Sequence, residues 1–534
     1  MRVTSAALSI LLGLDLIVAQ PRNAQTNAPA FHLLETTIDD VHAALKGGRT
    51  TCRQLVELYL RRIDAYDKSG PALNAVQTVN RRALEDAAKL DAALTAGAPV
   101  GALHCIPVLI KDQVDTSDIT TTYGSAVFKA FVPQTDATIV TKLKQAGAVI
   151  VGKATMGEFA SGYLSSASGP IRNAYDPRRH ASGSSGGTGA GIAANFATVG
   201  IGEDTGGSVR GPASVGSLVG LRPTLPLVSR HGMFPARPTT DTLGPMARTV
   251  RDAAIVFDAI VGYDPRDPVT AHAFGQIPAS YAMFLAPDGL SRARIGVLRE
   301  PMDAKTDPAS DDYKKVRAVI DRAIGELKGL GVEIADPITI PGVIDRVTRA
   351  YDGNVFETEP AINRFLEAHA KAPVKTLSDI LLSGKVVPSR TRALMATVGK
   401  STDDAGYLQI LRIAEETRQI LLGEMAGKRL DAVVYATFDH QPALIPPDAM
   451  TRPAVDDRTG NNRRLSPMLG FPAITVPAGF TSDGLPVGSS SLDGRSPSRR
   501  CSNSPMPTSR RPTTASRRRR LPRFPVNRDQ WPLS

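Results

Sequence analysis

Residues 182–210 read SGSSGGTGAGIAANFATVGIGEDTGGSVR and hold the densest pattern in the chain. Two loops rich in glycine and serine flank one alanine-rich segment and one short apolar run. Glycines allow main-chain N–H groups to converge on a small concavity that can hold a developing oxyanion, and a serine beside them can act as a nucleophile. The stretch therefore indicates a site for serine chemistry.

Other motif templates fit this stretch poorly. Residues 183–187 match the G-x-S-x-G nucleophile elbow, but residues 175–180 before them lack the pattern of the strand that an elbow requires. Residues 189–194 match a dinucleotide-binding G-x-G-x-x-A, again without a preceding strand. The chain contains no G-x-x-x-x-G-K-[ST] and no H-E-x-x-H. The sequence thus disfavours an α/β-hydrolase, a dinucleotide enzyme, a phosphate-loop enzyme and a zincin.

The segments on both sides predict the fold class. Short β-branched runs without polar alternation are typical of buried strands. Such runs occupy residues 108–110, 148–151, 197–201, 295–298, 332–334, 431–436 and 474–478. Residues 137–147 have helical spacing and predict a crossover helix, and Thr37 and Thr51 each precede a helical pattern that they can cap. These elements predict an α/β protein with helices on both faces of its sheet.

A serine nucleophile needs a base. The histidines stand in no recognisable triad motif: His32, His42, His104, His180, His231, His272, His369 and His440. The alternative is a lysine kept neutral by burial. Lys111 directly follows the apolar run 107–110, so its amine would emerge at a strand end. From composition alone, an ordinary solvated lysine fits the same position.

Several motifs, in order along residues 35–488, resemble those of the amidase signature family. They are Pro107-x-x-x-Lys111-Asp112, Gly152-Lys153 with Glu158-Phe159, Arg172-Asn173-x-Tyr175-Asp176-Pro177, Gly183-Ser184-Ser185-Gly186-Gly187, residues 204–213, residues 220–224, residues 244–250 and Gly470-Phe471-Pro472-Ala473. The resemblance implies a single large α/β/α domain with a mixed central sheet covered by helices on both faces. Cys105 departs from it, because the family usually has glycine there.

The resemblance also implies a Ser-Ser-Lys triad. Ser208 corresponds to the acylated nucleophile, Ser184 to the bridging serine on a cis peptide bond, and Lys111 to the base. The family's oxyanion hole corresponds to the main-chain N–H groups of Thr205, Gly206, Gly207 and Ser208. Structural support for this loop is expected from Ser185, Asp204 and Arg210. Neither a metal ion nor a cofactor is implied.

Composition and charge bound the remaining possibilities. With 42% apolar and 22% charged residues, the chain is globular rather than disordered, collagen-like or membrane-spanning. The net charge of +11 suggests a polyanion as partner, but residues 489–534 hold 11 arginines and 2 aspartates, which leaves only +2 on the rest. We therefore expect no nucleic-acid partner. Three scattered cysteines predict neither a disulfide framework nor a Cys-rich zinc site.

The two ends of the chain differ from its body. Residues 1–25 have a basic start, an apolar run and a small residue at a plausible cleavage point, as a secretory signal has. The run is shorter than the roughly 20 residues of a membrane span, so no transmembrane segment is expected. We expect a secreted or periplasmic protein, with a cytoplasmic one as the alternative.

Between the ends we expect an amidase domain at residues 30–488. Its core comprises residues 100–260 and 430–488, and residues 260–430 form a helical variable region. Residues 489–534 form a tail rich in Arg, Ser and Pro that predicts disorder. Permitted codons for residues 489–495, read one base earlier, spell Leu-Glu-Phe-Ser-Gly-Arg-Ser, which resembles the family's continuation. We therefore hypothesise a reading-frame slip near Gly488.

These observations predict an amidohydrolase for a small-molecule amide. It would cleave a carbon–nitrogen bond to a carboxylate and an amine or ammonia through an acyl-Ser208 intermediate. One alternative is the glutamine-hydrolysing A-type subunit of a tRNA-dependent amidotransferase, which shares the core and needs a partner subunit. The other is a non-catalytic or poorly folding product, if the altered C-terminus prevents folding.

Overall fold

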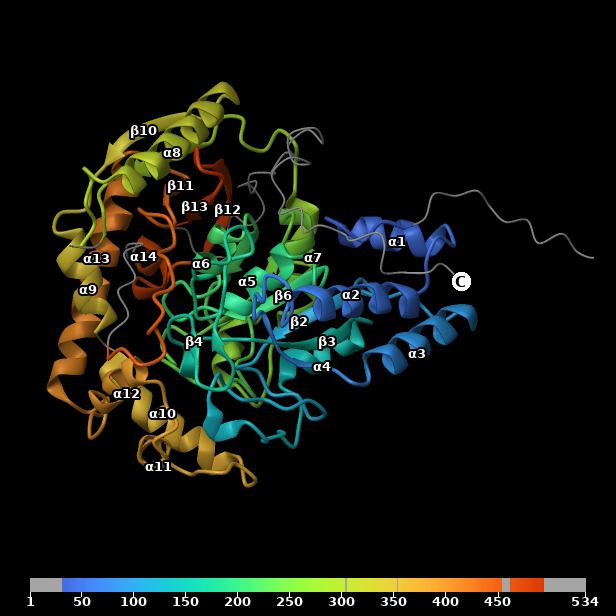
Figure 1. Ribbon diagram of the computed structural model, residues 1–534. Helices are drawn as coiled ribbons and strands as arrows, with labels where there is room; N and C mark the ends of the chain where they lie inside the picture. Colours follow the sequence, from blue (N-terminus) through green and yellow to red (C-terminus); the bar gives the residue numbers. More distant parts are fainter. Residues whose placement is uncertain (1–30, 303–304, 353, 454–461, 494–534) are drawn as a thin grey trace, which may run out of the picture.

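The computed structural model describes residues 31–302, 305–352, 354–453 and 462–493 (Figure 1). The expected leader at residues 1–25 lies outside these ranges, and so does the tail from residue 494 onward. Within the ranges that are described, no helix is long and apolar enough to cross a membrane.

One large mixed sheet organises the protein. Its 11 strands lie in the spatial order β1-β3-β2-β6-β8-β7-β12-β13-β11-β9-β10. In chain order they are β1 (Val76–Val79), β2 (Pro107–Lys111), β3 (Val149–Ala154), β6 (Val199–Glu203), β7 (Val219–Arg222), β8 (Leu243–Ala247), β9 (Arg294–Leu298), β10 (Glu333–Ile338), β11 (Ala432–Ala436), β12 (Ala473–Phe480) and β13 (Pro486–Leu492). A separate small sheet pairs β4 (Leu164–Ser165) with β5 (Gly169–Pro170).

The pairing of the strands is parallel in two places and antiparallel elsewhere. β2 lies between β3 and β6 and is parallel to both, and β9 is parallel to β10 and β11. The other pairs in the large sheet are antiparallel. Each apolar run singled out in the sequence coincides with a strand: β2, β3, β6, β9, β10, β11 and β12. The expectation of a mixed sheet is confirmed.

Helices lie on both sides of this sheet (Figure 1). They are α1 (Ile38–Lys46), α2 (Cys52–Tyr66), α3 (Ala83–Thr95), α4 (Thr138–Gln145), α5 (Gly186–Ala193), α6 (Arg210–Val215), α7 (Val250–Ile260), α8 (Asp311–Gly329), α9 (Val343–Tyr351), α10 (Asn354–Ala368), α11 (Leu377–Leu382), α12 (Pro388–Met395), α13 (Ala405–Gly427) and α14 (Leu465–Met468).

The first two helices begin where the sequence predicts. The Thr37 side chain accepts a hydrogen bond from the main-chain N–H of Asp40, and the Asp40 side chain accepts one from Thr37 in return. Thr51 and Gln54 form the same capping box at the start of α2. Such boxes satisfy N–H groups that lack a partner in the first helical turn, and both predicted caps are confirmed.

Alternate residues of β2 show that both faces of the sheet are buried. Val108 and Ile110 point into a core shared with α4 and α7. Leu109 points the opposite way, into a second core shared with α2, α3 and α5. Successive side chains of a strand face opposite sides, so helices must cover both faces to exclude water. The predicted α/β/α class is confirmed.

The predicted helical region at residues 260–430 also contains strands. α9 to α13 gather on one side of the molecule, opposite α1 to α3 (Figure 1). Ile362 and Leu366 of α10 and Leu377 of α11 pack against an aromatic cluster that includes Tyr123 and Phe234. β9 and β10, from the same region, extend the central sheet. The region is therefore partly a continuation of the sheet and not only a helical cap.

The last strand corrects the expected start of the tail. β13 continues to Leu492, four residues beyond the predicted boundary at residue 488. Ser489, Ser490 and Ser491 pair with β11 on one side and β12 on the other. Main-chain pairing with two neighbours holds these residues in the sheet, and the buried hydroxyl of Ser490 also forms a hydrogen bond of 2.8 Å with Thr437 Oγ1. The sheet thus extends through Leu492 in the printed reading frame.

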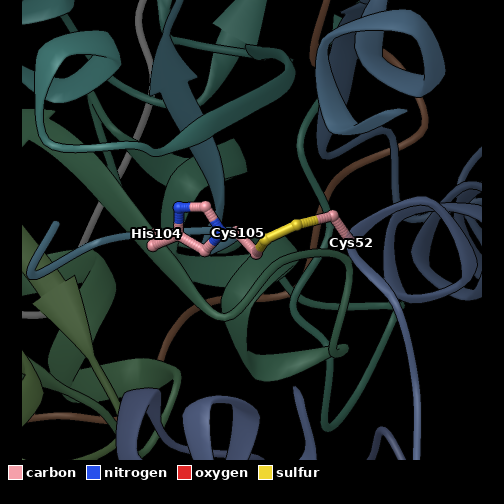
Figure 2. Close-up of side chains that lie close together, drawn as sticks. All are labelled: Cys52, His104 and Cys105. Atoms are coloured by element: carbon pink, nitrogen blue, oxygen red, sulfur yellow. A yellow bond between two sulfur atoms is a disulfide. The ribbon is translucent and has the colours of Figure 1, made fainter. Parts of the chain in front are cut away.

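A disulfide joins Cys52 to Cys105 (Figure 2). The two Cα atoms are 5.2 Å apart across 53 residues of sequence, and both side chains are fully buried. Cys105 has a φ of 61°, in the left-handed region that favours glycine. The spacing of the cysteines did not indicate this pair. It ties the start of α2 to the segment that leads into β2.

We expect the purified, denatured protein to contain one reactive thiol, that of Cys501, before reduction and three after it. Cys52→Ala should lower the free energy of unfolding by about 2–4 kcal/mol, since the bond restricts the unfolded chain. Thiol titration and urea unfolding measure the two effects, and reduced wild-type protein is the matched control. Three reactive thiols without reduction would contradict the pairing.

Candidate active site

Lys111 ends β2 and its side chain has no exposed surface. Its Nζ lies 2.8 Å from Ser184 Oγ and 3.0 Å from Glu203 Oε2. Burial lowers the pKa of Lys111, because an ammonium loses its hydration there, and the neighbouring Glu203 opposes that shift. The expected base and bridging serine are thus in hydrogen-bond contact.

Ser184 lies in the loop that leads into α5, and the Gly183–Ser184 peptide bond is cis. A side chain at position 183 would collide with the main-chain carbonyl of Gly162, so only glycine fits there. The main-chain oxygen of Ser184 accepts a hydrogen bond of 2.9 Å from Gly157. These contacts hold the Ser184 loop close to its neighbours on both sides.

Ser208 lies between β6 and α6, on the second glycine–serine loop. Its main-chain oxygen accepts a hydrogen bond of 3.4 Å from the N–H of Ser185, which joins the two loops. Ser208 is 9% exposed, Ser184 is 1% exposed and Lys111 is fully buried. Of the three side chains, Ser208 is therefore the one that solvent or a substrate can reach.

The loop from Thr205 to Ser208 offers main-chain donors. The N–H of Gly207 donates to Asp204 Oδ1 at 2.8 Å, so Asp204 occupies that donor in this structure. Within the described part of the chain, the N–H groups of Thr205, Gly206 and Ser208 donate to no protein acceptor. Three of the four donors predicted for the oxyanion hole are thus available to a ligand.

Asp204 stabilises this loop through buried ion pairs and main-chain hydrogen bonds. Its carboxylate forms buried ion pairs with Arg210 at 3.2 Å and Arg222 at 3.4 Å, and accepts hydrogen bonds from the N–H groups of Gly207 and Val209. Burial alone would raise the pKa of Asp204, but the two guanidinium groups outweigh it and hold the pKa at about 2. The predicted partner Arg210 is present, and Arg222 is an additional one.

Ser185 connects the start of α5 to β6 through its hydroxyl group. Its Oγ donates to the main-chain oxygen of Glu203 and accepts from the N–H of the same residue, both at 3.2 Å. The start of α5 is thus tied to the end of β6. This is the supporting position that the sequence predicts for Ser185.

A second buried lysine has a different environment. Lys153 Nζ on β3 lies 3.4 Å from Asp112 Oδ1 and 2.6 Å from both the main-chain oxygen of Val114 and Thr121 Oγ1. Burial lowers the pKa of Lys153 and Asp112 opposes the shift. The Lys153 amine thus lies beside a buried carboxylate and two further oxygen atoms, and no serine is among these contacts. Of these two lysines, Lys111 is the one that faces a serine.

Sequence reasoning missed three charged residues of the site: Glu203, Arg222 and Asp241. Glu203 lies within the quoted motif, beside Asp204, and could have been noticed as an acid next to the end of a strand. Arg222 lies in a motif to which no role was given. Asp241 is 36 residues from Thr205, to which it hydrogen bonds, and has no sequence signal.

The described residues contain one group that could hold a metal ion: Cys52, His104 and Cys105 (Figure 2). The two sulfur atoms are bonded to each other, so neither is a thiolate that could bind zinc. His104 Nε2 is buried and makes no hydrogen bond among these residues. This group lies away from the serines and takes no part in the site.

The site thus places a buried lysine, rather than a histidine, against a serine in an α/β protein with helices on both faces of its sheet. Comparison with protein families makes this specific. The model of the Amidase family matches residues 54–492. The chain therefore belongs to the amidase family and is an amide-hydrolysing enzyme.

Amidotransferase subunits and peptide amidases are among the known proteins similar to this chain. The A-type subunit of the glutamyl-tRNA(Gln) amidotransferase from Koribacter versatilis is 34% identical, over 85% of this chain and 93% of that protein. The solved peptide amidase of Stenotrophomonas maltophilia is 32% identical, with a TM-score of 0.77 over 86% of this chain and 93% of that one. The solved A-type subunit of the amidotransferase from Thermotoga maritima is 26% identical, with a TM-score of 0.63 over 87% and 92%.

We expect Asp204→Ala to lower the free energy of unfolding by about 3–5 kcal/mol, because Arg210 and Arg222 would remain buried without a carboxylate. Urea denaturation measures this loss. The matched control is Asp321→Ala, which removes a half-exposed partner 2.6 Å from Arg299 and should change stability by less than about 1 kcal/mol. Equal effects of the two substitutions would contradict the bracing role of Asp204.

Proposed function

We propose that this protein hydrolyses a small amide through an acyl-Ser208 intermediate. Neutral Lys111 takes a proton from Ser184, and Ser184 takes one from Ser208 as Ser208 Oγ attacks the amide carbon. Main-chain N–H groups of residues 205–208 stabilise the oxyanion that forms. The relay then returns a proton to the departing amine, and water hydrolyses the acyl-enzyme.

The observation that carries this proposal is the hydrogen bond of 2.8 Å between Lys111 Nζ and Ser184 Oγ. Geometry of this kind suits proton transfer, since general bases act within about 2.6–3.2 Å of the atom that they deprotonate. Burial supports it further, because it favours the neutral amine that a base must have.

For the substrate, we propose the carboxamide of a short peptide or a similar uncharged amide. The support is similarity: the solved peptide amidase has a TM-score of 0.77 to this structure, against 0.63 for the solved amidotransferase protein. The body of the chain also carries a net charge of only +2, which fits an uncharged substrate.

An A-type subunit of a tRNA-dependent amidotransferase is the second candidate. The observation in its favour is the 34% identity to the protein of Koribacter versatilis. Such a subunit would hydrolyse glutamine in a complex, and its activity would depend on partner subunits and on charged tRNA. The two functions therefore make opposite predictions for the isolated chain.

We also propose that the mature protein is secreted or periplasmic. The leader pattern at residues 1–25 suggests export, and the disulfide between Cys52 and Cys105 supports it, because disulfides persist mainly in oxidising compartments. A cytoplasmic protein would be expected to keep these two cysteines as thiols.

We expect the isolated protein to hydrolyse amides within a panel of aliphatic, aryl and peptide amides. Ser208→Ala and Lys111→Ala should each lower kcat/KM by at least about 10³-fold, because the groups of a nucleophile–base relay act as one unit. Product release followed by chromatography measures this, and circular dichroism checks that each variant is folded. Unchanged turnover in Ser208→Ala would refute the mechanism, and activity only with glutamine, charged tRNA and a partner would favour the amidotransferase.

We expect the protein recovered from an exporting host to lack the leader. Its intact mass should match a chain that starts near residue 26, and its first residues should be absent on N-terminal sequencing. A variant with Leu11→Arg and Leu12→Arg breaks the apolar run and should keep the full chain inside the cell. A full-length chain with reduced Cys52 and Cys105 would instead favour a cytoplasmic protein.

A further inference from the structure

Glu203 contacts the amine of Lys111 through two of its oxygen atoms. Its carboxyl Oε2 lies 3.0 Å from Lys111 Nζ, and its main-chain oxygen lies 3.4 Å from the same atom. A neutral amine has two N–H donors and one lone pair. When both donors point to Glu203, the lone pair is left for Ser184, whose Oγ is 2.8 Å away. Glu203 therefore fixes the orientation that a base needs.

The other carboxyl oxygen of Glu203 is linked to a second acid. Thr205 Oγ1 lies 2.6 Å from Glu203 Oε1 and 2.7 Å from Asp241 Oδ1, and all three side chains are buried. A hydroxyl group has one hydrogen, so it can donate to only one of the two acids. The other contact requires a proton on a carboxyl group. Glu203 and Asp241 thus hold at least one proton between them.

The hydrogen bonds and burial of Asp241 act in opposite directions on its protonation. Asp241 accepts hydrogen bonds of 2.8 and 2.9 Å from the N–H groups of Ala236 and Arg237, which favour its charged form. Burial first, and then the nearby Glu203, raise the pKa of Asp241 to about 7. Asp204 also faces Lys111, but Arg210 and Arg222 neutralise it. Asp241 can therefore hold the proton that the two contacts of Thr205 require.

We propose that Glu203 is a positioning residue for amide hydrolysis, which orients neutral Lys111 toward Ser184 while Thr205 and Asp241 control the proton on its carboxyl group. In the resting form, Lys111 is an ammonium, Glu203 a carboxylate and Asp241 an acid. In the active form, Lys111 is an amine, Glu203 an acid and Asp241 a carboxylate. On going from the resting to the active form, the Lys111 ammonium loses one proton, which passes to solvent. The proton of Asp241 reaches Glu203 through the hydroxyl of Thr205. This inference rests on the proposed function.

Glu203→Gln tests the proposal directly, because glutamine has the shape and hydrogen bonds of the protonated acid. Its carbonyl oxygen can accept from Lys111 and its NH₂ group can donate to Thr205. We expect this variant to stay active and the acid limb of its pH profile for kcat/KM to move down by about 1–3 pH units, since no carboxylate then stabilises the ammonium. Glu203→Ala should lose about 10²-fold in kcat with little change in KM.

Asp252→Asn is the matched control. Asp252 lies on α7, is buried, and has a pKa raised to about 6, mainly by burial. Its main partner is the N–H of Ile38, so removing this carboxylate should leave the acid limb of the pH profile in place. Melting curves check folding of all variants. If Glu203→Ala fails to fold, the pH profile of Glu203→Gln decides.

The rate at which a fluorophosphonate phosphonylates Ser208 Oγ, with loss of fluoride, serves as a second readout, because it needs no amide substrate. Wild-type protein that reacts with neither an amide nor the fluorophosphonate would overturn the proposed function itself. An active wild type with an inactive Glu203→Gln would overturn only the present inference, since it would show that the charge of Glu203 is required. An acid limb unchanged in Glu203→Gln would overturn it as well.

Discussion

A lysine amine without contact with water is the constraint on which the rest of the site depends. Moving an ammonium out of water is costly, so a buried lysine must either be neutral or have anionic partners. Lys111 meets this constraint with partners on two sides: the hydroxyl of Ser184 and the carboxyl group of Glu203. Its depressed pKa follows from burial. Lys111 Nζ has three polar contacts: one with Ser184 and two with Glu203. These contacts bring the end of β2, the end of β6 and the loop before α5 together.

The sheet makes this convergence possible. β2 and β6 are parallel neighbours, and Ile110 pairs with Ile201, so Lys111 and Glu203 leave the sheet at the same edge. The carboxyl ends of parallel strands are the usual place for a ligand in an α/β sheet. The loop after β6 is held by Asp204. Ion pairs with Arg210 and Arg222 stabilise the charged form of this carboxylate. Asp204 thus supports the loop and Glu203 contacts the base, although the two acids are adjacent in sequence.

Much of this could be predicted from the sequence, because the signals are local. The runs that became β2, β3 and β6 are short and apolar, and the serines and Lys111 lie in compact motifs. Pairings between distant segments were missed. Cys52 and Cys105 are 53 residues apart, and the contact of Asp241 with Thr205 depends on the packing of the loop before β8. β13 was missed because its serines carry no apolar pattern, and its place comes from two neighbouring strands.

The later half of the chain closes over the loop that the earlier half builds. Gly207 has a φ of 111°, and a Cβ there would lie within 2.6 Å of Arg463 Cδ. The main-chain oxygen of Arg463 accepts a hydrogen bond of 2.6 Å from Arg210, and a Cβ on Gly206 would lie 3.1 Å from the ring of Tyr351. Lys111, Ser184, Ser208 and the residues that support them thus come from residues 111–241, and the side chains around the loop come from residues beyond 340. The loop that carries Ser208 is therefore enclosed by a part of the chain that supplies neither Lys111 nor the two serines.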